Sequence, residues 1–295
     1  MCLIRLSAAA LGAALLAGTP AMAEIDPLSA DPPRDAAHPA RMEVVHIPSH
    51  GLRMNGVFYE AAGAGAHPTM VFFHGMPGNE QNLDLAQAVR RLGWNVLTLH
   101  YRGSWGSPGT YSYAHLVQDG IAAVAFVRTP ANASKYQIDP KHIVVGGHSS
   151  GGFVAVNTAA RVPKVAGLIL ISASDDAGEA LAARRGGPAA WRKFVKEGFD
   201  GLETLVGCTS DSLAKEVLAH ADAWTFAAAA PKLKTIPLLA VTADDGFARE
   251  ALNLADEVKA EGGEVQTVHM TTDHPYSDHR IALTRAVADW LRAHG

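Results

Sequence analysis

The segment that decides the fold reads Ile143-Val144-Val145-Gly146-Gly147-His148-Ser149-Ser150-Gly151-Gly152. It begins as a short β-branched apolar run, passes through a G-x-S-x-G unit from Gly147 to Gly151, and continues into a helix-compatible stretch at 153–160. A strand, a sharp turn and a helix in this order predict a nucleophile elbow, in which a strained turn holds a serine hydroxyl above a sheet.

The glycine spacing selects Ser149 rather than Ser150. Gly147 and Gly151 stand two positions before and after Ser149, where a tight turn leaves no room for Cβ atoms. Ser150 lacks this arrangement, because His148 stands two positions before it. The motif alone arises by chance in roughly one Gly-rich chain of this length in ten, so its meaning depends on partner residues elsewhere.

Apolar runs alternate with helical patterns on both sides of this motif. The expected strands are a hairpin at 42–48 and 53–60, followed by 70–74, 94–101, the strand before Ser149, 165–172, 236–242 and 265–270. Between them, apolar residues recur at helical spacing. Strands that alternate with helices predict an α/β fold with a mostly parallel sheet and right-handed crossovers.

The chain divides into a short leader, a tail and one large domain. Residues 24–41, rich in Pro, Ala and Asp, have no periodicity and are expected to form an N-terminal tail before a domain at 42–295. Within that domain, 175–234 shows no strand and several helix-like pieces of mixed charge (177–185, 188–198 and 211–221). We expect this segment to be a helical cap inserted between two core strands.

The first 23 residues have the pattern of a secretory signal peptide. Arg5 precedes an apolar stretch at 6–17, and Ala21-Met22-Ala23 forms an A-x-A cleavage signature. An uncleaved membrane anchor is the alternative, but the apolar stretch is too short to span a bilayer. The pattern therefore predicts a periplasmic or secreted protein cleaved after Ala23. The mature chain would keep only Cys208 and form no internal disulfide.

Composition narrows the classes of partner. The formal net charge is −4, and 18% of the residues are charged. A mildly acidic chain without blocks of basic residues implies no face for nucleic acid. We expect a small-molecule partner, and the sequence leaves the oligomeric state open.

A serine nucleophile needs a histidine base, and His274 is the preferred candidate. In this kind of fold the three groups follow in the order Ser, acid, His. His274 lies in the loop 271–277, between the last strand and the last helix, at the sheet edge where sites of parallel sheets assemble. His279, at the start of that helix, is the competitor, whereas His269 lies within a strand.

Two adjacent carboxylates, Asp244 and Asp245, are the candidates for the acid that orients this histidine. Both follow the strand at 236–242, and two neighbours cannot both face one imidazole. One is therefore expected to orient His274 while the other caps a helix or faces solvent. Asp256 lies on a helix and is a poor rival.

The acidic and histidine residues around His274 also raise the alternative of a metal site. The group consists of Asp273, His274, Asp278 and His279. No compact ligand set elsewhere in the sequence completes it, and Asp278 fits a capping or solvated role. We expect neither a metal nor another cofactor.

An oxyanion that forms during acyl transfer needs two hydrogen-bond donors. One is expected to be the backbone N–H of Ser150, directly after the nucleophile. The other is expected in the loop His74-Gly75-Met76-Pro77-Gly78, at Met76, because Pro77 has no N–H. In the loop 103–109 at the same edge, Trp105 is expected either to line a substrate pocket or to pack on the rim.

With these residues assembled, the chain resembles an α/β-hydrolase over roughly 42–295. It is most similar in pattern to the branch of prolyl oligopeptidase-like and dienelactone hydrolase-like serine esterases and peptidases. The matching pieces are the segments His74-Gly75-Met76-Pro77-Gly78, Tyr101-Arg102-Gly103-Ser104, Gly147-His148-Ser149-Ser150-Gly151-Gly152, Thr242-Ala243-Asp244-Asp245 and Asp273-His274-Pro275. In the peptidases of that branch the first Asp of such a pair is the catalytic acid, which the resemblance transfers to Asp244.

The resemblance implies an exported serine hydrolase that cleaves carboxylic esters through an acyl-enzyme on Ser149. Dienelactone hydrolases use a cysteine where this chain has Ser149, and the peptidases carry a large propeller that this chain lacks, so a small esterase fits better. A peptidase or amidase, or an acyltransferase, using the same triad is the alternative. A non-catalytic binding protein on the same scaffold is a third possibility, disfavoured because a candidate is present for each catalytic role.

Overall fold

The computed structural model describes residues 26 and 28–294. The predicted signal peptide at 1–23 lies outside the described residues. Within the described part, no helix is both long enough and apolar enough to cross a membrane.

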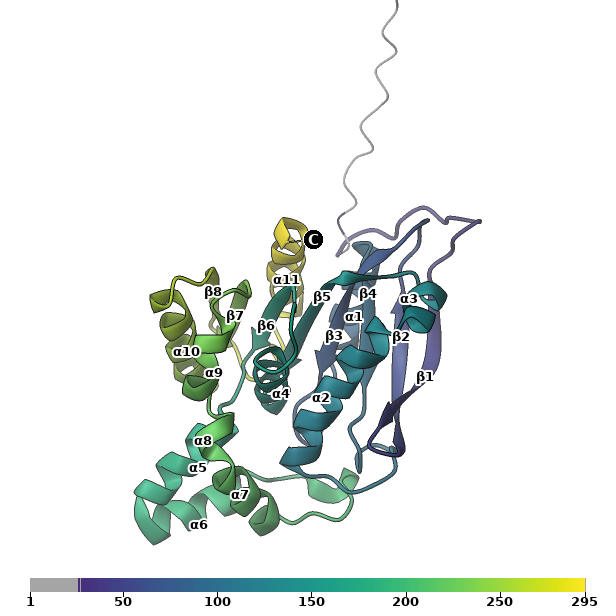
Figure 1. Ribbon diagram of the computed structural model, residues 1–295. Helices are drawn as coiled ribbons and strands as arrows, with labels where there is room; N and C mark the ends of the chain where they lie inside the picture. Colours follow the sequence, from purple (N-terminus) through teal and green to yellow (C-terminus); the bar gives the residue numbers. More distant parts are fainter. Residues whose placement is uncertain (1–25, 27, 295) are drawn as a thin grey trace, which may run out of the picture.

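A single sheet of eight strands forms the centre of the described molecule (Figure 1). Its order is β1-β2-β4-β3-β5-β6-β7-β8, with β1, β2 and β4 paired antiparallel and the pairs from β4–β3 to β7–β8 parallel. The strands are β1 Arg41–Ser49, β2 Leu52–Glu60, β3 His67–Phe73, β4 Asn95–Leu99, β5 Ile138–His148, β6 Gly167–Ile171, β7 Leu238–Ala243 and β8 Val265–Met270. The predicted fold class is confirmed.

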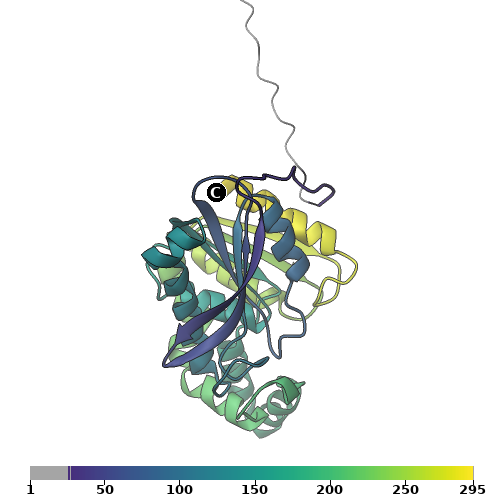
Figure 2. The same cartoon turned by 90° about the vertical axis from the view of Figure 1, so that its right-hand side faces the viewer.

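Helices cover both faces of the sheet (Figure 2). On one face α1 (Leu83–Arg91) and α11 (Arg280–His294) pack against the strands, and on the other lie α2 (Tyr113–Arg128), α4 (Ser150–Ala159) and α10 (Ala248–Ala260). The short α3 (Pro130–Lys135) follows α2 and was not expected from the sequence.

Side chains of the central strands alternate between two apolar clusters. In β3, Val71 and Phe73 belong to the cluster under α2 and α4, whereas Met70 and Phe72 belong to the cluster under α1 and α11. All four are almost completely buried. A parallel strand buried on both faces needs a continuous apolar run rather than alternation, which is why the sequence of this strand reads as it does.

Between β6 and β7 the chain forms a helical segment that extends beyond the sheet edge (Figure 1). Its elements are α5 Asp176–Arg185, α6 Gly187–Glu197, the short 3-10 turn η1 Leu202–Thr204, α7 Ser210–Ala219, α8 Ala221–Trp224 and α9 Phe226–Leu233. The sequence analysis did not identify α8 and α9. Helix α9 returns to the core and packs against α4 and α10.

Hydrogen bonds fasten this cap to the core on the side away from α9. The Glu216 carboxylate on α7 accepts the backbone N–H groups of Tyr113 (2.8 Å) and Ala114 (3.2 Å) in the first turn of α2. The first-turn N–H groups of a helix have no partner within it, and a carboxylate there also interacts favourably with the helix dipole. Val206 N–H adds a backbone bond to Gly103 O at 2.8 Å.

Candidate active site

The G-x-S-x-G segment forms a sharp turn between β5 and α4. Ser149 has φ 58° and ψ −130°, a conformation that non-glycine residues rarely adopt and that the surrounding structure must hold. A Cβ on Gly147 would lie 2.0 Å from the carbonyl oxygen of Gly151, and a Cβ on Gly151 would lie 2.1 Å from that of Phe73. Both motif glycines are therefore required by close backbone packing, and Ser149 is the residue that they expose.

His274 contacts Asp245 and not Asp244. Its Nδ1 lies 2.8 Å from Asp245 Oδ2, and the Asp245 side chain is only 2% exposed. The Asp244 side chain is 57% exposed and lies 3.1 Å from Nε2 of His269. The expectation that Asp244 orients His274 is therefore wrong, and its neighbour occupies that place.

The pairing of β7 with β8 explains this difference. The backbone ladder continues one step beyond the strands, where Asp244 N–H donates to Thr272 O at 3.1 Å. Side chains of consecutive residues point to opposite faces at such a position, so Asp244 turns out toward His269. Asp245, the first residue past the ladder, faces His274.

The surroundings of Asp245 keep this carboxyl ionised. Burial alone would raise its pKa, but hydrogen bonds from His274, Ser172 and the N–H of Phe247 outweigh it and lower the pKa below its usual value. A carboxylate can only accept, so Nδ1 of His274 carries the proton in this bond. In the neutral imidazole the other nitrogen, Nε2, is then the free base.

His148, the second residue of the motif, connects the elbow to the histidine loop. Its Nε2 lies 3.0 Å from the carbonyl oxygen of His274, and the two ring centroids are 4.5 Å apart. Burial lowers the pKa of His148 to about 4, so the ring is neutral at pH 7 and its Nε2–H donates to that carbonyl. The competitor His279 instead pairs with the exposed Asp278 at 2.8 Å.

One cavity of about 350 Å³ brings the predicted catalytic groups together. Its lining includes Ser149 and His274, together with Met76 and Ser150, the two residues expected to supply oxyanion donors. Ser150 is the first residue of α4, so its N–H is one of those that a helix leaves unpaired. The cavity therefore brings together a serine hydroxyl, an imidazole and the two residues expected to supply backbone N–H donors.

Buried side chains hydrogen-bond to the carbonyl groups of the loop after β3. Nδ1–H of the buried His74 donates to Gly75 O at 2.6 Å, and the Tyr101 hydroxyl donates to His74 O at 2.9 Å. Burial lowers the pKa of His74 to about 4, so its ring acts as a neutral donor. These bonds fix the peptide planes of the loop, which is what a preorganised oxyanion site requires.

Trp105 belongs to this support and is not among the residues that line the 350 Å³ cavity. Its indole Nε1–H donates to Pro77 O at 2.8 Å, and its ring stacks on His100 with centroids 6.0 Å apart. Of the two roles expected for Trp105, the structure favours packing on the rim.

Several other residues of the cavity were not identified from the sequence, among them Asp176, Glu179 and Phe247. Asp176 follows the carboxyl end of β6, so the rule that sites gather at the carboxyl edge of a parallel sheet was the available signal. Among the residues that the structure describes, no group of three or more His, Cys, Asp or Glu side chains is arranged to hold a metal ion.

A mostly parallel sheet with a serine on a strained strand-to-helix turn and a His–Asp pair at the same edge defines the α/β-hydrolase class. The model of the family described as "Alpha/beta hydrolase family" matches residues 70–293. The chain therefore belongs to the alpha/beta hydrolase family, which supports hydrolase activity. The narrower expectation of a prolyl oligopeptidase-like or dienelactone hydrolase-like branch stays a prediction.

Sequence relatives cover only part of the chain. An uncharacterised protein of Mycobacterium tuberculosis is 31% identical over 136 residues, which are 46% of this chain and 47% of that protein. The lysophosphatidylserine lipase ABHD12 of Danio rerio is 29% identical over 108 residues, 36% of this chain and 26% of the lipase. The chain thus spans about half the length, or less, of these relatives.

Solved esterase structures share the fold over most of the chain. The esterase of Pyrobaculum calidifontis has a TM-score of 0.63 at 19% identity and covers 87% of both chains. Est1E from Butyrivibrio proteoclasticus has a TM-score of 0.64 at 17% identity, covering 85% of this chain and 98% of its own. The carboxylesterase EstE1 from a metagenomic library has a TM-score of 0.61 at 22% identity, covering 87% and 90%.

Proposed function

We propose that the protein is a serine hydrolase that cleaves carboxylic esters through an acyl-enzyme on Ser149. Family membership and the esterase structures that share the fold support this reaction class. The observation that carries the proposal is the 2.8 Å bond from His274 to the buried Asp245, at a cavity that His274 shares with Ser149. A histidine held in this tautomer beside a strained serine is the arrangement that activates a hydroxyl.

In the proposed reaction, Ser149 Oγ attacks the ester carbonyl while His274 Nε2 takes the hydroxyl proton. Asp245 holds the tautomer and stabilises the imidazolium. The N–H groups of Met76 and Ser150 bind the oxyanion, and each such donor typically contributes about 3–4 kcal/mol of transition-state stabilisation. His274 returns the proton to the leaving alcohol, and a water activated by the same histidine hydrolyses the acyl-enzyme.

Labelling with a fluorophosphonate probe together with p-nitrophenyl butyrate turnover tests the proposal. The wild type should be labelled on Ser149, as located by peptide mapping, and Ser149→Ala should lose labelling and lower kcat by about 10⁴-fold or more. The Ser150→Ala variant keeps the nucleophile and the backbone donor, so its adduct should still map to Ser149. Retention of both labelling and turnover by Ser149→Ala would refute the assignment.

We also propose that the protein acts outside the cytoplasm after removal of residues 1–23. The A-x-A signature at Ala21-Met22-Ala23 supports this proposal. Expression of the full chain in a bacterial host, followed by fractionation and N-terminal sequencing, should yield a periplasmic or secreted protein that begins at Glu24. An uncleaved chain in the membrane fraction would favour the anchor instead.

A further inference from the structure

A second, larger cavity adjoins the catalytic cavity. A cavity of about 700 Å³ under the cap shares Glu179, Glu197, Gly198 and Phe247 with the 350 Å³ cavity that holds Ser149. Phe247 stands between the two, with its ring centroid 5.1 Å from that of His274.

Carboxylates dominate the lining of the catalytic cavity. Its described lining contains Asp176, Glu179, Glu197 and Asp200 but no lysine or arginine. The second cavity is lined by the cations Arg249 and Lys193, and the Lys193 ammonium lies 3.8 Å from the Glu197 carboxylate. The cavity around Ser149 therefore offers negative charge to a substrate and no fixed cation to bind an anion.

Asp176 is the most buried of these acidic residues, and one of its two carboxyl oxygens has no hydrogen-bond partner among the described residues. The residue is 6% exposed, and its Oδ1 accepts hydrogen bonds from the hydroxyls of Ser174 (2.7 Å) and Ser150 (3.3 Å). Its Oδ2 has no hydrogen-bond partner among the described residues. This oxygen is closed off from the cavity, and the hydroxyl of the buried Tyr113 interacts with the same carboxyl, so what the chain fails to supply to Asp176 is a cation.

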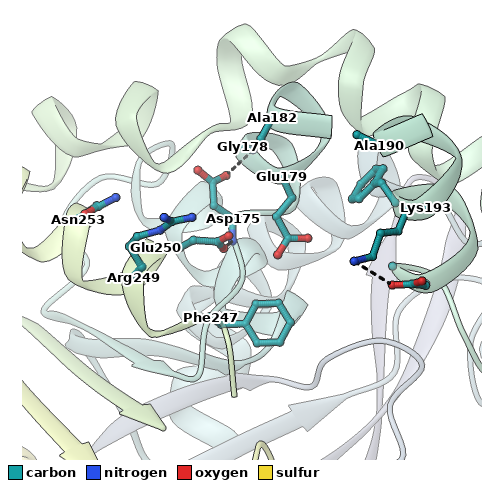
Figure 3. Close-up of a pocket in the computed structure, with 13 residues that line it drawn as sticks. Asp175, Gly178, Glu179, Ala182, Ala190, Lys193, Phe247, Arg249, Glu250 and Asn253 are labelled. Atoms are coloured by element: carbon teal, nitrogen blue, oxygen red, sulfur yellow. Dashed lines mark hydrogen bonds and ion pairs between the residues drawn. The ribbon is translucent and has the colours of Figure 1, made fainter. Parts of the chain in front are cut away.

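Glu179 lies one helical turn after Asp176 and faces another carboxyl, that of Glu250 on α10. Figure 3 shows both side chains around the 700 Å³ cavity, above the ring of Phe247. The Glu179 and Glu250 carboxyls lie close enough for each to affect the ionisation of the other. Burial, followed by the charge of Asp176, raises the pKa of Glu179 to about 9, so a proton occupies the place that a larger cation would fill.

We infer that Asp176 and Glu179 form a cation subsite beside Ser149, and that the preferred substrate is an ester carrying a protonated amine. This inference rests on the proposed esterase function and specifies its substrate class. A protonated amine in the cavity would supply one positive charge and at least one N–H donor beside the Asp176 and Glu179 carboxyls, where the chain itself places no lysine or arginine.

An amine fits this subsite better than a metal ion or an anion. The described residues contain no metal-binding group of three or more ligands, so the carboxyls are not arranged around a metal. A phosphate or carboxylate, such as those of a lysophosphatidylserine headgroup, would face four acidic side chains in the catalytic cavity and no lysine or arginine. Like charges without a compensating cation disfavour such a ligand in a partly buried site.

The subsite lies close to the bond that is broken. Asp176 accepts from the hydroxyl of Ser150, the residue directly after the nucleophile. The amine is therefore expected near the ester group, rather than at the end of a long chain, on either the acyl or the alcohol side.

Two matched pairs of esters test the inference at neutral pH. Dimethylaminoethyl butyrate against isoamyl butyrate places the cation on the alcohol, and phenylalanine methyl ester against methyl hydrocinnamate places it on the acyl group. Turnover is followed in a pH-stat, and each kcat/KM is divided by the hydroxide-catalysed rate of the same ester. We expect the cationic member to be preferred at least about tenfold in one pair, equivalent to about 1.4 kcal/mol.

Variants assign this preference to the subsite. Asp176→Asn and Glu179→Gln should each lower the cationic-to-neutral ratio of kcat/KM by about tenfold. Asp222→Asn removes the same charge from an exposed position on α8 outside both cavities and should keep the wild-type ratio. A merely structural role would lower both rates together and leave the ratio unchanged.

The outcomes separate this inference from the proposed function. Equal wild-type rates within both pairs, or an unchanged ratio in both variants, would overturn the subsite while leaving the esterase intact. Absence of turnover on all four esters, together with no fluorophosphonate labelling, would overturn both. If kcat/KM divided by the hydroxide-catalysed rate is higher for phenylalanine naphthylamide than for phenylalanine methyl ester, the subsite stands and the protein is an amidase rather than an esterase.

Discussion

Two buried aspartates, Asp119 and Asp176, have opposite electrostatic surroundings. Asp119 on α2 is fully buried, and it accepts the side chain of Arg102 at 2.6 Å, the backbone N–H of Arg102 at 2.8 Å and the hydroxyl of Ser49 at 2.6 Å. Asp176 on α5 has two hydroxyl donors, no cation and one unpartnered oxygen. The first carboxylate is completed by the chain itself, and the second is not.

The two aspartates separate buried charges that stabilise the fold from buried charges that the fold leaves without a counter-charge. A buried charge is tolerated where the fold supplies a counter-charge and hydrogen bonds. Where the fold supplies no counter-charge, as at Asp176 beside Ser149, the proposed amine substrate would supply it. Asp245 is intermediate, because its partner is the imidazole of His274 rather than a guanidinium.

The largest expected effect concerns the adjacent aspartates Asp245 and Asp244. Asp245→Asn should lower kcat by about 10³–10⁴-fold, because an amide can donate to Nδ1 and favour the wrong tautomer of His274. Asp244→Asn is the matched control, and its kcat should stay within a few-fold of wild type, since this residue contacts only the exposed His269. Steady-state kinetics on p-nitrophenyl butyrate measures both, and the reverse order of effects would restore Asp244 as the acid.

Removal of Asp119 should cause the largest loss of stability. Asp119→Ala leaves the buried Arg102 guanidinium without its counter-charge and should lower the free energy of unfolding by about 3–5 kcal/mol. Asp211→Ala breaks a surface pair with Lys215 and should change it by less than about 1 kcal/mol. Urea denaturation measures both, and equal losses would contradict the contrast between buried and surface pairs.

Asp176→Asn should have the opposite sign and stabilise the protein at alkaline pH. Burial raises the pKa of Asp176 from 3.8 to about 7, which corresponds to at most about 4 kcal/mol of unfavourable ionisation above that pH. Asn removes the charge and leaves an oxygen for the Ser174 and Ser150 hydroxyls. Allowing for a buried NH₂ without an acceptor, we expect a gain of about 1–2 kcal/mol in the free energy of unfolding at about pH 8.

The pH dependence gives the sign of this effect. A carboxyl with a raised pKa stabilises the folded state below its unfolded pKa, and this contribution is lost as the pH rises through about 7. The advantage of Asn over Asp should therefore shrink toward about pH 4. Groups that face Asp176 from other elements are Glu250 on α10 and Tyr113 on α2, with Asp175 and Glu179 beside it. Thermal unfolding of the wild type and Asp176→Asn between about pH 4 and pH 8 measures this change. A stability difference that does not vary with pH would contradict the raised pKa of Asp176.

The smallest expected effect concerns Trp105. Trp105→Phe keeps an aromatic ring against His100 but removes the indole N–H that donates to Pro77 O. Loss of one neutral hydrogen bond, about 0.5–1.5 kcal/mol, should lower kcat by about 2- to 10-fold through the oxyanion loop, with KM nearly unchanged. A change confined to KM would instead assign Trp105 to substrate binding.

The sequence was informative wherever the requirement is local. The elbow could be predicted because it requires glycine at two positions, 147 and 151. A Cβ there would clash with atoms only a few residues away or on the adjoining strand. The position of His274 followed from chain order and from the rule that parallel strands end at one edge. Runs such as 70–74 predicted buried strands because both faces of the sheet are covered.

The rest depends on contacts that no local pattern encodes. The choice between Asp244 and Asp245 is set by how far the β7–β8 ladder continues, one backbone hydrogen bond beyond the strands. The carboxyls under the cap come from α5 and α10, and the hydrogen bond from the Asp175 backbone N–H to the Glu250 carboxylate joins residues 75 apart. Burial of Asp176 requires both elements in place, so its sequence neighbours gave no sign of it.

The bond from Glu216 to the first turn of α2 bears on how the enzyme would turn over. Movement of the cap away from the core would break these hydrogen bonds and leave two N–H groups at the start of α2 without their carboxylate. We therefore expect the cap to stay in place during turnover. Substrates then have to enter through the existing opening, so the width of the substrate limits access before its charge or hydrogen bonding can be recognised. We expect rates to fall steeply with the width of the ester and to depend little on solvent viscosity.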